Sequence, residues 1–161
     1  MFYSFLEDTP AGRILVAGDE TAIAEVRFLH GRPERSVIPP EWQPDPKPLQ
    51  AGLEQLLAYF EGRLTEFDVP IRLTGTPFQR SVWNALRRVP FGTTASYGQI
   101  AKSIGRPKAC RAVGAANGKN HIPIIVPCHR IIGSSGALVG FGGGLKIKQA
   151  LLKLEGVPVR A

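Results

Sequence analysis

Apolar and polar residues alternate along the first thirty residues of the chain, with the two-residue period of half-buried β-strands. Turn-forming residues interrupt this alternation at 10–12 and again at 18–19. The pattern predicts three short antiparallel strands, at residues 4–6, 13–17 and 23–28.

The hydrophobic period changes to that of a helix after a proline-rich loop at residues 39–48. One face of this helix is expected to carry five apolar side chains: Leu49, Leu53, Leu56, Leu57 and Phe60. Gly62 is expected to end this helix. A last strand is predicted at 67–73, before a boundary at Thr74-Gly75.

The second half of the chain is patterned for helices. A capping hydroxyl, a proline and a glutamine at 76–79 mark a helix start, and Ser96 with Gln99 marks another. The second helix is expected to run through Ile104 and to end at Gly105. A third helix is predicted from 108 to about 117, so that the second and third form a helix-turn-helix candidate. A final helix is predicted at 145–154. The chain therefore divides into an α/β domain at 1–75 and a mainly helical domain at 76–161.

Charge separates the two halves more sharply than the overall net charge of +7 suggests. Residues 1–75 hold seven basic and twelve acidic residues, whereas residues 76–161 hold thirteen basic residues and one acid, Glu155. A surface so poor in acids favours a polyanionic partner, because positive charge steers association and displaces counterions from phosphates. A charge bias that merely aids solubility is the alternative.

The cysteine count indicates the compartment. Cys110 and Cys128 are too few for a disulfide framework, and no metal-binding spacing of cysteine and histidine occurs, so we expect no metal and a reducing cytoplasm. The first residues lack a signal-peptide pattern, and no apolar run approaches the roughly 20 residues of a membrane helix.

The predicted third helix is unusually small in side-chain volume. Residues 109–116 contain little bulk apart from Arg111 and Val113. Small residues permit either close packing inside a core or close approach to a narrow partner surface such as a DNA minor groove, with Arg111 as the probing side chain. The basic setting favours the second interpretation.

Cys128 lies in a setting that suggests nucleophilic chemistry. A thiol reacts as its thiolate, so it needs a base or a positive field, for which His129 and Arg130 are candidates. The base would in turn need an orienting acceptor, and Glu155 is the only carboxylate in this half, although an exposed, unimportant glutamate is the alternative. The glycine-rich loop at 133–144 is either a flexible connector or a segment whose backbone amides approach a flat ligand, with Val139 and Phe141 as apolar walls.

These residues carry a family resemblance. The string IIVPCHRII at 124–132, FGGGL at 141–145 and LLKLEG at 151–156 resembles the O6-alkylguanine-DNA alkyltransferases, and the similarity spans nearly the whole chain, most densely from Thr76 to Gly156. The resemblance implies an α+β fold, with an N-terminal ribonuclease H-like antiparallel sheet and helix and a winged-helix-like C-terminal domain.

The resemblance also implies residue roles. Cys128 would accept the alkyl group, His129 would deprotonate it through a water, Glu155 would orient His129, and Asn120 would brace the turn. Tyr97 would contact the flipped guanine and help rotate the target phosphate. Arg111 would replace the extruded nucleotide within a minor-groove helix. The corresponding DNA-binding set is Arg111, Tyr97, Ser96, Ala109, Ala112 and Gly114, and the pocket set is Tyr97, Val139, Phe141, Gly142 and Gly143.

The implied function is direct-reversal repair of duplex DNA, in which one alkyl group passes irreversibly from O6-alkylguanine to Cys128 without a cofactor. Phe141 departs from the pattern, because a tyrosine is usual there. Activity on O4-alkylthymine is left open, as is clustering on DNA of what is expected to be a monomer.

Three alternatives belong to other classes. The chain could be a helix-turn-helix regulator, but its recognition helix offers few side chains that reach major-groove base edges. It could be a lesion-binding relative without transfer activity, but such proteins replace the acceptor cysteine by tryptophan. It could be a cysteine hydrolase using Cys128, His129 and Glu155, which would leave the DNA-binding features unexplained.

Overall fold

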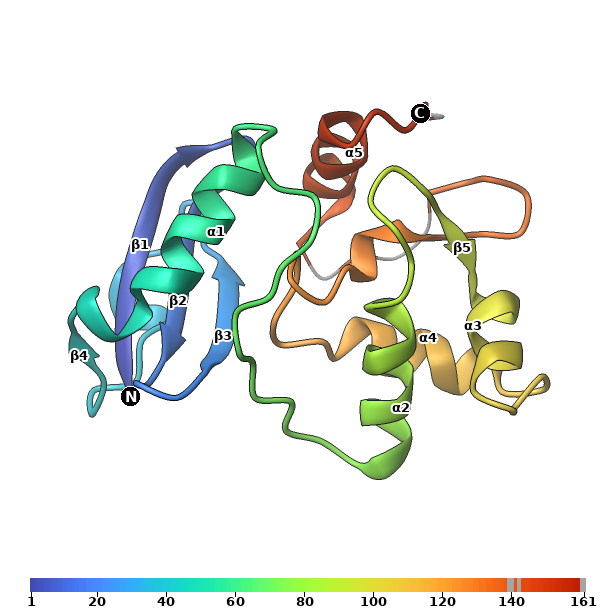
Figure 1. The fold of residues 1–161 in the computed structure, drawn as a ribbon, viewed down its shortest axis with the longest axis horizontal. Coiled ribbons are helices and arrows are strands. Elements are labelled where there is room, and N and C mark those ends of the chain that lie inside the picture. Colours follow the sequence, from blue (N-terminus) through green and yellow to red (C-terminus); the bar gives the residue numbers. More distant parts are fainter. Residues whose placement is uncertain (139–140, 142, 160–161) are drawn as a thin grey trace. The chain divides into compact units, whose positions relative to one another are not determined.

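A computed structural model describes residues 1–138, 141 and 143–159 and divides the chain into two compact units, Met1–Leu73 and Thr74–Ala161. The elements of both units are labelled in Figure 1. The first contains β1 (Phe2–Thr9), β2 (Gly12–Gly18), β3 (Ile23–Phe28), η1 (Glu34–Ser36), β4 (Gln43–Pro44), η2 (Lys47–Leu49) and α1 (Gln50–Phe60). The second contains α2 (Pro77–Leu86), β5 (Ala95–Ser96), α3 (Tyr97–Ser103), α4 (Cys110–Gly118), η3 (Cys128–Arg130), β6 (Ile131–Ile132) and α5 (Leu145–Leu154). The α+β fold class predicted from the sequence is confirmed.

The first unit is built on a four-stranded sheet in the order β3-β2-β1-β4. The three predicted strands are confirmed, and β1 and β2 extend beyond their predicted bounds. They pair antiparallel, whereas the two-residue β4 joins β1 in parallel. The central strand β2 is buried on both of its faces, because successive side chains point to opposite sides of a sheet. Leu15 and Ala17 on one of those faces pack with Leu29 and Val37.

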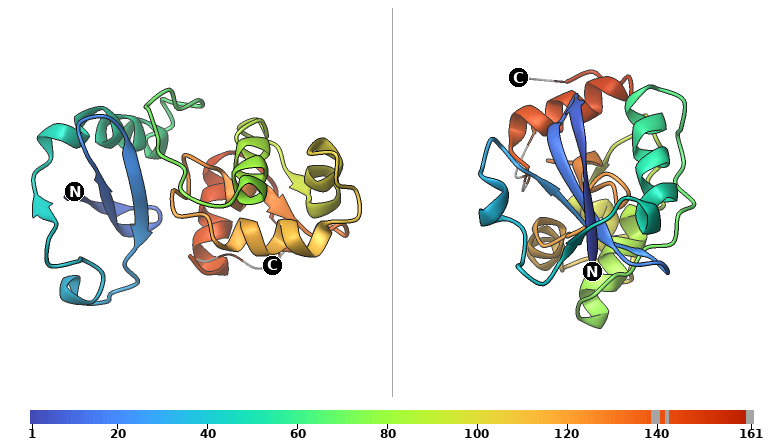
Figure 2. Two further views of the ribbon diagram at one scale, coloured as in Figure 1. Left: turned by 90° about the horizontal axis from the view of Figure 1, so that it is seen from below. Right: turned by 90° about the vertical axis from the view of Figure 1, so that its left-hand side faces the viewer.

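Helix α1 covers the sheet, as Figures 1 and 2 show. Gly52 makes this close approach possible, since a Cβ atom there would lie 2.6 Å from the Ile23 side chain. Leu56 and Phe60 are buried as predicted, but Leu57 is 47% exposed, so its assignment to the buried face was wrong. The helix turns about 100° per residue, which moves Leu57 off the stripe occupied by Leu56 and Phe60.

The strand predicted at 67–73 is also wrong. Only Ile71 forms a bridge, in parallel, to Ile23 at the edge of β3. The Ile23 amide donates to the Pro70 carbonyl, and the Arg72 amide donates to the Ile23 carbonyl. Pro70 has no amide hydrogen to donate, which limits the pairing of this segment with the sheet.

Helices α2, α3 and α4 pack against one another in the second unit. Both predicted capping boxes are confirmed: Thr76 caps α2 with Gln79, and Ser96 caps α3 with Gln99. The third predicted helix begins at Cys110, two residues later than expected. The Ala109 amide closes a turn back to Arg106 instead.

A short parallel ladder connects distant parts of the second unit. Ala95 of β5 pairs with Ile131 of β6, and Ser96 pairs with Ile132. Because α3 begins directly after β5 and η3 ends directly before β6, the ladder brings the start of α3 close to the Cys128 turn. Within the described residues, no helix has both the length and the apolarity needed to cross a membrane.

Candidate functional site around Cys128

Cys128 is held in a tightly bonded backbone turn. The Val126 amide donates to the Ile122 carbonyl at 2.9 Å, and the Cys128 amide donates to the Val126 carbonyl at 2.8 Å. Asn120 spans the same turn: its Nδ2 donates to the Val126 carbonyl at 2.8 Å, and its Oδ1 accepts from the Ile122 amide at 3.0 Å. Ile124 adopts a positive φ of 75°, a costly conformation for a β-branched residue. The bonds from Asn120 therefore hold a strained turn in place.

The thiol of Cys128 is buried, with the residue 5% exposed. Burial raises its pKa to about 11, because a buried thiolate loses its hydration, while a hydrogen bond from Asn120 and the charge of Lys148 act in the opposite direction. At neutral pH the resting group is a thiol, with a thiolate fraction on the order of one in ten thousand. The site therefore needs a base.

His129 and Glu155 form a buried pair. The His129 Nε2 lies 2.6 Å from Glu155 Oε2, and neither side chain is exposed. Arg130 donates through Nε to Oε1 at 2.8 Å and through Nη2 to Oε2 at 3.1 Å, and the Gly92 amide donates to Oε1 at 3.3 Å. Glu155 is thus buried and fixed within the protein, so the alternative of an exposed glutamate is excluded.

The pairing with Glu155 determines which nitrogen of His129 carries its hydrogen. A carboxylate held by an arginine only accepts hydrogen bonds, so Nε2 donates to Glu155 and Nδ1 keeps its lone pair. Nδ1 is buried and makes no hydrogen bond among the described residues. Burial lowers the pKa of His129 more than Glu155 raises it, so the imidazole rests uncharged. An uncharged ring with a free lone pair can accept a proton.

Lys148 was missed in the sequence and belongs to this site. The side chain is fully buried on α5, and its Nζ donates to the Ile131 carbonyl. Burial lowers its pKa to about 8, and the nearby Cys128 partly offsets that change. The lysine, rather than Arg130, supplies the positive field at the thiol. Its position could have been noticed, because it falls on the helical stripe of Leu151, Leu152 and Glu155.

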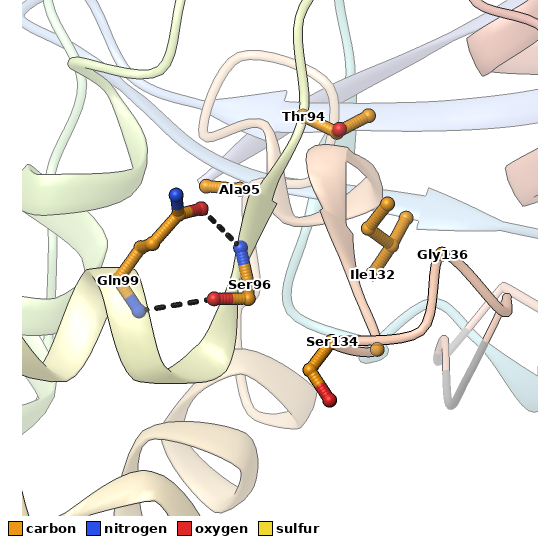
Figure 3. A pocket seen from close by; sticks show the side chains of 8 residues that line it. Thr94, Ala95, Ser96, Gln99, Ile132, Ser134 and Gly136 are labelled. Atoms are coloured by element: carbon orange, nitrogen blue, oxygen red, sulfur yellow. Dashed lines mark hydrogen bonds between the residues drawn. The ribbon is translucent and has the colours of Figure 1, made fainter.

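Tyr97 begins α3 beside the thiol. Its side chain is half-buried, and burial, followed by the charge of Cys128, raises the pKa of its phenol. A Cβ atom at Gly114 would lie 3.7 Å from its ring, so Tyr97 also borders α4. The Ser96 hydroxyl is engaged in capping, since it accepts from the Gln99 amide at 3.1 Å (Figure 3). The same figure shows a pocket of about 250 Å³ between the start of α3 and the loop that bears Ser134.

Helix α4 has two different faces. Val113 and Ala116 are buried, and Trp83 Nε1 donates to the Ala116 carbonyl at 2.9 Å. Arg111 and Ala112 are exposed, whereas Ala109 and Gly114 are half-buried. The core-packing interpretation of the small residues therefore holds for the buried side of the helix, and the other side is open to a partner. The exposed side presents one long side chain among small ones.

The glycine-rich loop is described only in part. Phe141 is half-buried, and its carbonyl accepts from the Gly144 amide at 2.9 Å, while Gly143 is buried. Val139 and Gly142, both predicted pocket residues, lie outside the described residues. Across the described part of the chain, no three His, Cys, Asp or Glu side chains are arranged to hold a metal ion.

Known proteins resemble the chain over nearly its whole length. Residues 1–73 match a family model described as the ribonuclease-like domain of 6-O-methylguanine DNA methyltransferase, and residues 77–157 match the DNA binding domain of the same family. A methylated-DNA–protein-cysteine methyltransferase of Methanosarcina acetivorans is 51% identical, with 97% of this chain and 99% of that protein covered. One of Mycobacterium bovis is 52% identical, with coverage of 92% and 88%. A crystal structure of Mycobacterium tuberculosis OGT in complex with DNA matches with a TM-score of 0.87 at 48% identity, covering 96% of this chain and 92% of that one.

Proposed function

The chain belongs to the 6-O-methylguanine DNA methyltransferase family, and from this membership we infer how its residues carry out the reaction. It is a methylated-DNA–protein-cysteine methyltransferase that binds DNA and acts in direct-reversal DNA repair. We propose that Cys128 accepts the alkyl group from O6-alkylguanine and retains it. The single observation that carries this proposal is the burial of Cys128 beside the His129–Glu155 pair.

The target base must first leave the duplex. An O6 atom within stacked DNA is out of reach of a buried sulfur, and rotating the nucleotide outward costs a few kcal/mol. The exposed face of α4 suits a minor groove, because its small residues let the backbone approach. Arg111 would fill the gap left by the base, and Ser96, Ala109, Ala112 and Gly114 would lie against the DNA backbone. Tyr97, at the border of α4 and the thiol, would guide the rotated nucleotide.

Proton removal from Cys128 comes next. A thiol with a pKa of about 11 reacts at neutral pH only when a base takes its proton. His129 would accept that proton at Nδ1 through a bridging water, while Glu155 holds the other nitrogen. Lys148 would stabilise the thiolate as it forms.

Alkyl transfer then balances as a direct displacement. The sulfur forms a bond to the alkyl carbon as the bond from that carbon to O6 breaks, and guanine departs with a proton supplied by the phenol of Tyr97. Because burial raises the pKa of Tyr97, the phenol is protonated at neutral pH and would donate only as negative charge develops on the departing guanine. Val139, Phe141, Gly142 and Gly143 would enclose the guanine.

The product is a thioether, which is stable in water. Cys110, the other cysteine of the chain, is exposed on α4 rather than placed in the buried site. Each molecule would therefore react once. Because Cys128 must stay reduced until then, we place the protein in the cytoplasm, where thiols persist. It would act there as a monomer on duplex DNA.

Intact mass spectrometry tests the proposal. After incubation with duplex DNA containing O6-methylguanine, the protein mass should rise by one methylene per molecule, on the peptide containing Cys128. Cys128→Ser should abolish the increase, and Cys110→Ser should leave it unchanged. Binding to the damaged duplex without any mass increase would instead favour a lesion-binding protein or a helix-turn-helix regulator.

A further inference from the structure

Arg130 is buried but does not face the thiol. Besides its two bonds to Glu155, its Nη1 donates to the Val89 carbonyl at 2.7 Å, and its guanidinium carbon lies 5.8 Å from the centre of the Phe91 ring. A bidentate arginine–carboxylate pair fixes both the position and the charge of the carboxylate. The carboxylate fixed here is the one that orients His129.

The charges around His129 determine whether its ring is protonated. Glu155 alone would favour the imidazolium form, since an adjacent negative charge stabilises a cation. Arg130 neutralises that negative charge, and Lys148 adds a second cation on the Cys128 side. Protonation of His129 would thus place a third cation in a buried cluster with one carboxylate. Glu155, Arg130 and Lys148 are the titratable and charged groups that act on this ring, and Cys128 precedes it in the chain.

We propose that Arg130 is a positioning residue that acts through Glu155 and keeps His129 uncharged, so that the ring is ready to accept the Cys128 proton. The inference rests on the proposed function, because it assigns His129 as the base. Two further observations agree with it: burial is the main cause that lowers the pKa of His129, and the Arg130 and Lys148 charges lower it further. Without Arg130, the ring would be protonated at a higher pH and would lose its function as a base.

Arg130 also has a structural contact, so its test must separate the two roles. The bond to the Val89 carbonyl fixes the chain after α2. Loss of that contact alone would lower the reaction rate by the same factor at every pH. If Arg130 instead keeps His129 unprotonated, its loss would lower the reaction rate mainly at low pH.

The experiment measures the rate of Cys128 alkylation by free O6-methylguanine between pH 5 and 9, which removes DNA binding from the result. In the plot of alkylation rate against pH, Arg130→Met should move the fall in rate at low pH upward by about one pH unit. The rate at pH 6 relative to that at pH 8 should therefore fall approximately tenfold. Arg130→Lys should restore much of the wild-type pH dependence of the rate, because lysine retains the positive charge beside Glu155. In a Glu155→Gln background, Arg130→Met should cause a smaller shift, because Arg130 then acts on the ring only through its own charge. A pH dependence of the rate that is unchanged by Arg130→Met would overturn the proposal.

Histidine ¹⁵N NMR of the wild-type protein gives a second test that needs no Arg130 variant. Because burial lowers the pKa of His129, its signals should still report a neutral ring at pH 6.5, the ordinary pKa of histidine. An imidazolium at pH 7 would overturn the inference even if Arg130→Met failed to fold. Failure of the proposed function would differ, because the wild-type protein would then gain no methyl group on Cys128 whatever the charge of His129.

Discussion

Glu155→Gln removes one negative charge from a fully buried cluster and keeps nearly the same side-chain shape. The carboxylate accepts from His129 at 2.6 Å, from Arg130 at 2.8 and 3.1 Å, and from the Gly92 amide at 3.3 Å. A glutamine can accept at only one of its two terminal atoms, so some of these donors lose their partner. Arg130 is left as a buried cation without its counter-charge.

Two magnitudes follow from this geometry. Removing one partner of a buried ion pair costs about 3–5 kcal/mol, so the free energy of unfolding should fall by that order. His129 loses the acceptor that orients it, and general-base catalysis contributes about 10²–10⁴-fold. We therefore expect alkylation of Cys128 to slow by roughly a hundredfold or more, with DNA affinity nearly unchanged, because Glu155 is buried and does not contribute to the protein surface.

Single-turnover alkylation by free O6-methylguanine, urea unfolding and DNA titration measure the three effects separately. Lys153→Gln is a matched control, since Lys153 lies on the last turn of α5, is exposed, and takes no part in the cluster. The control should react with the free base at the wild-type rate. A folded Glu155→Gln protein that reacts as fast as wild type would refute the argument that Glu155 orients the base.

Other predictions concern the thiol field, the DNA-binding helix and acid stability. Lys148→Met should slow iodoacetamide alkylation of Cys128 at pH 7 by about tenfold, and the difference from wild type should shrink above pH 8, where Lys148 loses its own proton. Arg111→Ala should weaken repair of duplex DNA far more than reaction with the free base; equal losses in the two rate assays would exclude a role in extrusion. The pKa of His129 is lowered by burial, so the unfolded chain takes up its proton first as the pH falls. The free energy of unfolding, measured with urea, should therefore decrease below about pH 6.5, and a constant value down to pH 5 would contradict a neutral buried ring.

Local sequence patterns predicted local structure well. Thr76 and Ser96 each supplied a capping hydroxyl with glutamine three residues later, and both helices begin there. A capping box involves neighbouring residues only, so it can be read without the tertiary structure. The predicted strand at 67–73 failed because pairing depends on a partner strand and on amide donors, one of which Pro70 lacks.

The site was predictable in its parts but not in its electrostatics. The residue pattern singled out His129 and Glu155, the family resemblance added Asn120, and the structure brings all three to the Cys128 turn. The expected effect of Arg130 on the thiol was wrong, since its guanidinium binds Glu155 instead. Adjacency in sequence does not state which way a side chain points. Burial, which raises the pKa of Cys128, is likewise a property of the packed fold and not of the motif.

The ladder between β5 and β6 has a mechanical consequence. Ala95 and Ser96 lead directly into the first residue of α3. The carbonyl of Ile131, on the paired strand, accepts a hydrogen bond from Lys148 Nζ. The pairs Ala95–Ile131 and Ser96–Ile132 therefore couple the position of α3 to that of the Lys148 acceptor. An insertion of a single residue at Ser96 would shift the pairing of β5 with β6, whereas the same insertion at Ser134 would leave that pairing intact.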